Sequence, residues 1–338
     1  RITPSHLTHI FETFRDTGPM KYRWLFIWIT AYLFNFLGHT LFELNMSLSL
    51  DLKSIILDAL SREEVTNLSN VRDYRFRVYW EASVLGSLFA YISAIAWGIR
   101  TYFKYLNHNL THPILLIGVA TIAEEVFRLA TSGESSAEFN TIFCTTYDAL
   151  QHLSSVTPDF MAMVTALIKI INFLAVCSPG ILLMGICSAL TVPNNRREHS
   201  LDDLIERDAA IDQSVLIGSL MMVMGLIHMG CWMDWPIETM ADSNLKTAIL
   251  ALTASVYEYW GICFSILLLL IYAGSKWVWN SIVMDILPTH HPDIDPNSFV
   301  TDHGLGFRIR HHLPHAIAII LPVLSSMGGS GSSIFTMH

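Results

Sequence analysis

The sequence predicts an all-α integral membrane protein, built as a bundle of about six transmembrane helices with short amphipathic interfacial helices. Hydrophobic residues make up 52% of the 338 residues and charged residues only 14%, whereas ordinary soluble domains carry roughly 25% charged residues. Six apolar stretches approach the roughly 20 residues that a helix needs to cross a bilayer. Several of these stretches carry internal charges, which normally face a bundle interior, a partner or a water path.

The apolar stretches divide the chain into a membrane domain between two tails. Residues 1–20 are the predicted cytoplasmic N-terminal tail, residues 21–279 the six-span domain, and residues 280–338 a cytoplasmic tail rich in histidine and proline. The predicted spans lie near residues 24–43, 80–103, 113–131, 160–190, 213–234 and 247–276.

Three segments outside the spans also show helical patterns. After Asp51, apolar residues recur on one face opposite charged ones, as in a helix that lies on a membrane surface. Ser200 with Asp203 resembles a capping box, which predicts a helix that leads straight into the fifth span. The apolar stretch 316–327 is too short to cross and contains Pro322, which favours a re-entrant, interfacial or partner-buried segment.

Lysine and arginine collect mostly at one set of span ends, which predicts that both termini are cytoplasmic. The segment 44–80 disagrees, because it would lie outside and yet contains five basic residues, Lys53, Arg62, Arg72, Arg75 and Arg77. The net charge of −9 argues against nucleic acid as a partner. The expected partners are the lipid bilayer and either further copies of the chain or other membrane subunits.

Polar residues recur on one face of the first span. Their spacings of three, four and four place them along one side of a helix: Tyr32, Asn35, His39 and Glu43. Interhelical hydrogen bonding is the usual role of such a stripe in a membrane bundle. Lining of a pathway, and haem or metal ligation by His39, are the alternatives.

Ionisable residues inside the later spans are the other candidate site residues. Glu124 and Glu125 lie within helical reach of Arg128 in the third span, and Lys169 can snorkel from the fourth span to the interface. Counting these charges leaves one carboxylate unmatched. Glu258 lies about halfway through the sixth span, so it is the candidate for a proton-coupled site or for a buried pair.

Histidines and nearby aspartates supply the candidate cofactor ligands. His39 and His228 could hold a haem if they faced each other. Zinc is the other candidate cofactor, although the spacing of its candidate ligands matches no established zinc motif. These ligands are His290, His291, Asp293 and Asp295.

No P-loop, dinucleotide fingerprint or nucleophile elbow occurs, which favours a role other than catalysis. The first hypothesis is a polytopic membrane protein that forms or gates a pathway for a small ion or solute, as an oligomer. The second is a non-transporting scaffold or triggered effector subunit that assembles with partner chains. The third is a membrane-embedded metal or haem enzyme.

Overall fold

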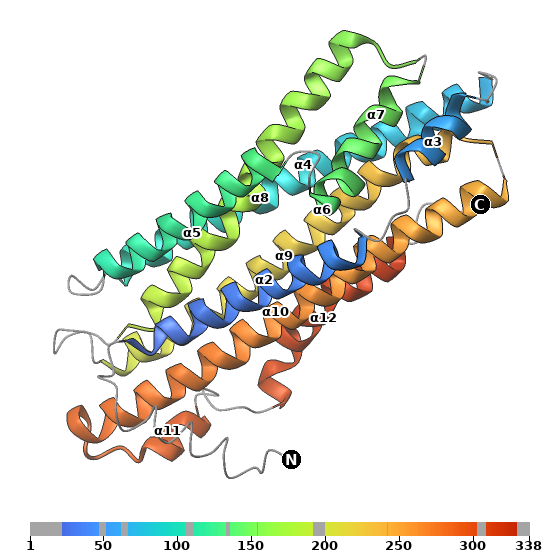
Figure 1. The fold of residues 1–338 in the computed structure, drawn as a ribbon. Coiled ribbons are helices and arrows are strands. Elements are labelled where there is room, and N and C mark those ends of the chain that lie inside the picture. The colour runs from blue at the N-terminus through green and yellow to red at the C-terminus, as the bar shows by residue number, and fades with distance from the viewer. Residues whose placement is uncertain are drawn as a thin grey trace.

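In a computed structural model, the described part of the chain is all-helical. It comprises residues 22–46, 52–61, 67–105, 111–132, 136–153, 155–191, 200–241, 243–302 and 309–329. Within it, five helices are long and apolar enough to cross a membrane: α2 (Trp24–Met46), α4 (Asn67–Lys104), α8 (Pro158–Ala189), α9 (Leu201–Thr239) and α10 (Asn244–His290). They form one elongated bundle (Figure 1). The prediction of an all-helical protein with several helices long and apolar enough to span a membrane is confirmed.

The third predicted span forms helix α5 (Thr111–Ser132), which is not one of these five. Its 22 residues would extend over about 33 Å at 1.5 Å per residue, but three of them are charged. α5 packs against α8 in the opposite direction, because Gly118 lies against Met184 and Ile122 lies against Gly180. The count of six spans therefore stays a prediction.

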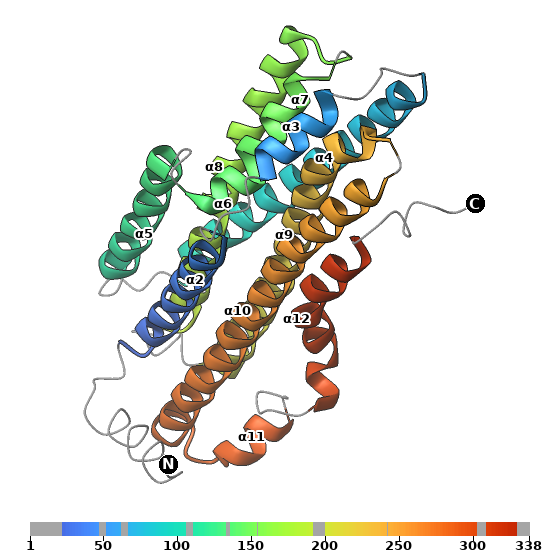
Figure 2. The same ribbon diagram turned by 45° about the vertical axis from the view of Figure 1, so that its right-hand side comes forward.

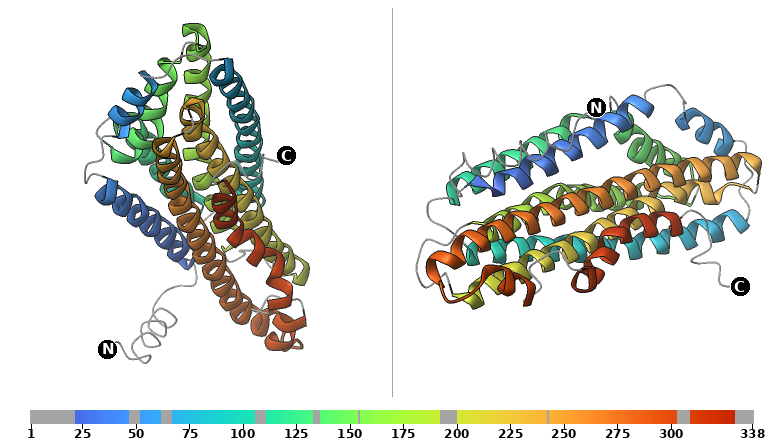
Figure 3. Two further views of the ribbon diagram at one scale, coloured as in Figure 1. Left: turned by 90° about the vertical axis from the view of Figure 1, so that its right-hand side faces the viewer. Right: turned by 90° about the horizontal axis from the view of Figure 1, so that it is seen from below.

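Successive long helices alternate in direction, so the connecting segments gather at two ends of the bundle (Figure 2). One end, which we call the α7 end, holds α3 (Leu52–Ser61), α6 (Ala137–Phe139), the π-helical turn η3 (Asn140–Cys144) and α7 (Thr145–Gln151). The opposite end holds α11 (Pro296–Asp302), and we call it the α11 end. The long helices extend between these two ends (Figure 3).

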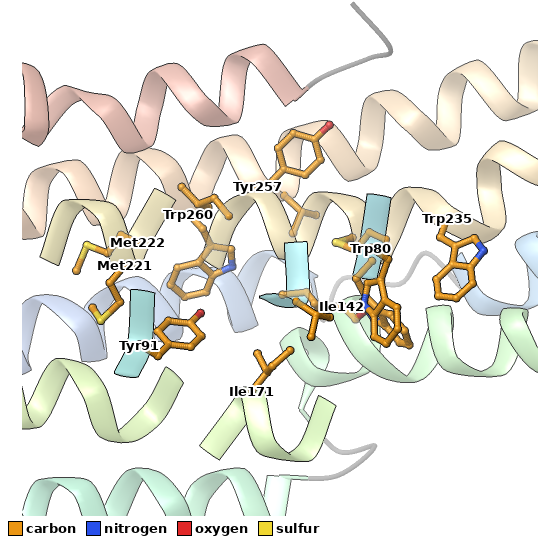
Figure 4. Close-up of a cluster of buried hydrophobic side chains, with 14 of the residues drawn as sticks. Trp80, Tyr91, Ile142, Ile171, Met221, Met222, Trp235, Tyr257 and Trp260 are labelled. Carbon is orange, nitrogen blue, oxygen red and sulfur yellow. The ribbon is translucent and has the colours of Figure 1, made fainter. Parts of the chain in front are cut away.

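Buried tryptophans hold α4 and α9 together near the α7 end (Figure 4). The ring of Trp80 lies 5.4 Å from that of Trp235 and 6.0 Å from that of Trp232. Trp235 Nε1 donates a hydrogen bond of 2.7 Å to Asp73, and Arg77 donates one of 2.9 Å to the same carboxylate. A buried carboxylate is stable only when it is paired in this way, so Asp73 joins these helices.

Glycines permit the close approach of α4 and α8. A Cβ atom added at Gly98 would lie 2.6 Å from the carbonyl oxygen of Ile181, and one added at Gly185 would lie 2.9 Å from that of Gly98. Small residues at such contacts are typical of membrane bundles, where close backbone packing replaces the hydrophobic effect between helices.

Two of the predicted helices outside the spans are present. Ser200 Oγ accepts a hydrogen bond of 3.2 Å from the backbone nitrogen of Asp203, and α9 then continues without a break to Thr239. The predicted amphipathic segment forms α3. Its Ile56 is buried in a cluster with Ile237 and Ile249, so part of its apolar face packs on the bundle.

The C-terminal part of the chain folds back onto the bundle. Helix α10 continues through residue 280 to His290, and α11 packs against it. Helix α12 (Ile309–Gly329) packs against α9 and α10 (Figure 2). It runs antiparallel to α10, because His315 stacks on Tyr272 while Ser326 lies against Gly261. The apolar stretch 316–327 therefore lies against helices of its own chain.

Candidate polar pathway between helices α2, α5 and α6

The polar stripe predicted in the first span faces α5 and α6. We call the stripe and its partners the α2 seam. From α2 it contains Trp28, Tyr32, Asn35, His39 and Glu43, and from α5 and α6 it contains Thr121, Glu124, Glu125, Arg128, Ser136 and Glu138. The sequence indicated four of the α2 residues, and the structure adds Trp28, which extends the same helical spacing by one turn.

The seam begins in the half of α2 nearer the α11 end. Trp28 Nε1 donates a hydrogen bond of 3.2 Å to Thr121 Oγ1. One turn further, the Tyr32 hydroxyl donates one of 2.9 Å to the Glu124 carboxylate. The two contacts therefore join α5 to α2 through side chains.

Arg128 connects the middle of the seam. Asn35 Nδ2 lies 3.5 Å from the Glu125 carboxylate, and that carboxylate also pairs with the Arg128 guanidinium one turn along α5. Arg128 is also within electrostatic range of Glu124 and Glu138. The predicted pairing of Arg128 with an acid of its own helix is confirmed.

His39 continues the seam toward the α7 end. Its Nδ1 lies 2.6 Å from the Glu138 carboxylate, and both side chains are about a quarter exposed. The imidazole also packs on Trp260 of α10, with 4.9 Å between ring centroids. His39 is therefore held between an acid and an aromatic ring.

Glu43 ends the seam by capping α6. Its carboxylate accepts hydrogen bonds from the backbone nitrogens of Ala137 and Glu138, at 2.8 and 3.1 Å, and from the Ser136 hydroxyl. Negative charge at a helix N-terminus is stabilised by the unpaired N–H groups there. Glu43 therefore has a structural role that the sequence did not indicate.

The seam covers much of a membrane's thickness. From Trp28 to Glu43 it extends about 22 Å at 1.5 Å per residue, against roughly 30 Å for a hydrocarbon core. Four carboxylates accompany one guanidinium and one imidazole along this length. The excess of acids favours cations and protons over anions.

A small cavity lies beside the middle of the seam, lined by Asn35, Gly38 and Trp260 among others, with a volume of about 10 Å³. This is about the space that one water molecule occupies. Trp260 Nε1 is buried and finds no hydrogen-bond acceptor within the described residues. A water molecule in the cavity would supply an acceptor if the indole nitrogen faces it.

Glu258 and Lys169, the other predicted pathway residues, lie outside the seam. Lys169 is exposed on α8, and Glu258 is half-buried on α10. Gly261 and Ser265, which lie about one and two turns along α10 from Glu258, contact α12 at Ser326 and Val323.

The candidate haem ligands belong to different interfaces. His228 is buried between α9 and α4, where its Nδ1 lies 3.1 Å from Ser83 Oγ, whereas His39 lies between α2 and α6. The predicted zinc ligand Asp295 accepts a hydrogen bond of 2.9 Å from the backbone nitrogen of Ser298 at the start of α11. Over the described ranges, no three His, Cys, Asp or Glu side chains are placed to hold a metal ion.

A second polar cluster, which the sequence did not indicate, lies between α9, α10 and α12. Lys276 Nζ lies 2.7 Å from Asp208 and 2.6 Å from Asp212, and its side chain is 4% exposed. His315 Nε2 lies 3.8 Å from Asp212, and its ring stacks on Tyr272 at 5.2 Å. The sequence contains one indication of this cluster: a spacing of four residues separates Asp208 from Asp212 and Tyr272 from Lys276, so each pair shares one face of its helix. Only the packing of α9 against α10 shows that the two pairs meet.

Comparison of the chain with protein-family models, with curated proteins and with solved structures finds no match. Over the residues that the structure describes, the fold itself defines the class, an all-helical protein with five helices able to span a membrane.

Proposed function

We propose that this protein conducts protons across a membrane along the α2 seam. The observation that carries the proposal is the succession of polar contacts from Trp28 to Glu43, which follows one face of a helix able to cross a membrane. Polar side chains inside a membrane bundle commonly form hydrogen bonds across helices. Here they follow one another for about four turns, and α5 and α6 provide partners along that length.

Direct side-chain contacts favour the proton over a larger solute. The α2 residues reach their partners at distances of 2.6 to 3.5 Å, which leave no room for a hydrated ion between them. Carboxylate, imidazole and phenol groups can each accept and release a proton. The cavity beside Asn35 has room for a water molecule that could bridge neighbouring groups.

Asn35→Leu tests the proposal because it keeps the side-chain volume and removes the polar group in the middle of the seam. In liposomes loaded with a pH-sensitive dye, we expect proton flux driven by a potassium diffusion potential to fall by at least about tenfold. Tyr32→Phe removes only the hydroxyl that contacts Glu124, and we expect it to lower the flux as well.

Matched controls lie outside the seam. Tyr79→Phe removes a hydroxyl that accepts a hydrogen bond from Arg75 on α4, and Glu206→Gln removes an exposed carboxylate that pairs with Lys104. Both should keep the wild-type flux. Wild-type liposomes no more permeable than empty ones, or a wild-type flux from folded Asn35→Leu protein, would show that the seam only joins helices.

A further inference from the structure

Glu258 and Lys169 are opposite charges on two helices of this chain, where Lys169 is exposed and Glu258 is half-buried. Within the described residues, neither side chain has a hydrogen-bond or ion-pair partner. Both lie inside helices able to span a membrane. A charge that faces hydrocarbon is costly, so such residues normally pair with another group. The described part of a single copy therefore leaves this acidic and this basic side chain without a partner, and a neighbouring protein could supply the opposite charge to each.

The face of α10 that carries Glu258 is exposed above and below it. Toward the α7 end it has the small exposed residues Ala251 and Ser255, and toward the α11 end it has Ile262, which is 50% exposed. Small residues let another helix approach closely. We call Ala251, Ser255, Glu258 and Ile262 the acidic face.

The face of α8 that carries Lys169 has the same order and the same spacing. Ala162 and Ala166 are exposed on the side toward the α7 end, and Phe173 is 52% exposed on the other side. We call Ala162, Ala166, Lys169 and Phe173 the basic face. Each face thus presents two small residues, one charge and one large apolar residue, at spacings of four, three and four.

The two charges lie at similar depths in the bundle. The ring of Phe160 on α8 contacts that of Trp235 on α9, and Thr253 on α10 bonds to the adjacent Asp234, so these residues mark one level. From that level, Lys169 lies about 14 Å and Glu258 about 8 Å along its helix. The difference is about one helical turn, which the long side chain of lysine can cover.

The acidic and basic faces cannot meet within one molecule, because α9 and α2 each pack against both α8 and α10 and lie between them (Figure 2). Both helices run from the α7 end to the α11 end. In two copies with the same membrane orientation, α8 of one copy can therefore lie parallel to α10 of the next. Two different faces that meet make a head-to-tail interface, which closes into a ring if the rotation allows.

We infer that copies of this chain assemble head to tail, with the basic face of one copy against the acidic face of the next and Lys169 paired with Glu258 of its neighbour. The interface lies away from the α2 seam, so it does not depend on the proposed proton conduction. The partner at this interface is a second copy of the chain, because one chain carries both the acidic and the basic face. The two faces match in charge, in residue spacing and in helix direction.

Charge reversal tests the interface. In lipid nanodiscs or bilayers, single-molecule photobleaching should show an oligomeric wild type. Lys169→Glu places two acids at each contact and Glu258→Lys places two bases there, so we expect each to weaken association by at least about tenfold. The double variant K169E/E258K exchanges the charges and should restore assembly.

Mixing the two single variants gives a sharper result. Lys169→Glu protein carries acids on both faces and Glu258→Lys protein carries bases on both, so a mixture should form hetero-oligomers that neither forms alone. Glu81→Lys, which reverses an exposed charge on α4, is the control and should assemble as the wild type does. A monomeric wild type, or single variants that assemble normally, would overturn the inference. So would a mixture that stays monomeric.

Discussion

At Lys276, two carboxylates from α9 surround one ammonium from α10. The Lys276 side chain is 4% exposed and that of Asp208 10%, so the energy of each charge depends on the others rather than on water. Removing one member of a buried ion pair leaves its partner uncompensated, and this is more costly than removing the whole group. The cluster is therefore expected to be a sensitive point of the fold.

Lys276→Met should lower the free energy of unfolding by about 3 to 5 kcal/mol, because it leaves Asp208 and Asp212 without their shared cation. The measurement is SDS-induced unfolding in mixed micelles. Lys104→Met is the matched control: its ion pair with Glu206 is exposed, so the loss should be under about 1 kcal/mol. Adding Asp208→Asn and Asp212→Asn to Lys276→Met should recover much of the loss, and an unchanged stability of Lys276→Met would contradict this account.

Basic residues near the α7 end explain why one connection disagrees with the predicted orientation. Arg77 pairs with the buried Asp73, and Arg72 Nη1 donates to the carbonyl oxygen of Met240 just beyond the end of α9. Lys53 pairs with Asp148 of α7. Because these cations are bound to groups of the protein, counting them as free loop charges overstates their weight in the positive-inside rule.

Among the helices, α4 and α8 pack with their backbones in close contact at Gly98 and Gly185. In a membrane, lipid tails are as apolar as side chains, so close packing and polar contacts hold helices together. A side chain at this crossing would push against backbone, which cannot move aside as a flexible side chain can.

Gly98→Ala should therefore destabilise the bundle, by about 1 to 3 kcal/mol, the usual cost of overpacking. The same SDS unfolding experiment measures the change. Gly230→Ala is the matched control on α9, because an added Cβ atom there would lie 3.8 Å from the Tyr257 ring, at an ordinary contact distance. Equal effects of the two substitutions would show that the α4–α8 crossing is not unusually tight.

The molecule as a whole has two distinct ends, and the predicted orientation assigns the α11 end to the cytoplasm. In a variant without its five native cysteines, we expect a membrane-impermeant maleimide added outside intact cells to label Ser61→Cys at the α7 end. It should label Thr289→Cys at the α11 end only after the cells are opened. Both positions are exposed, so accessibility in the folded protein is matched. Labelling in the opposite order would reverse the orientation and place the start of α2 outside.

The sequence alone predicts features that depend on local pattern. Hydropathy over about 20 residues predicts six spans, five of which correspond to described helices able to span a membrane. The spacing of Tyr32, Asn35, His39 and Glu43 identifies a polar face. Local chemistry also identifies the helix start at Ser200 and the pairing of Arg128 with an acid of its own helix, and the structure selects Glu125 rather than Glu124. The sequence predicts α5 as a span although it contains three charged residues. In the structure, α5 is not among the five described helices that are long and apolar enough to cross a membrane.

What only the tertiary structure decides is which faces meet. Depth along a helix placed Glu258 at the centre of a possible path, whereas packing leaves it half-buried at the surface of the bundle and places α12 against Gly261 and Ser265. The Lys276 cluster brings together residues from helices α9, α10 and α12. A helical pattern determines the angle between residues on one helix, but the rotation of each helix in the bundle depends on the side chains of all its neighbours.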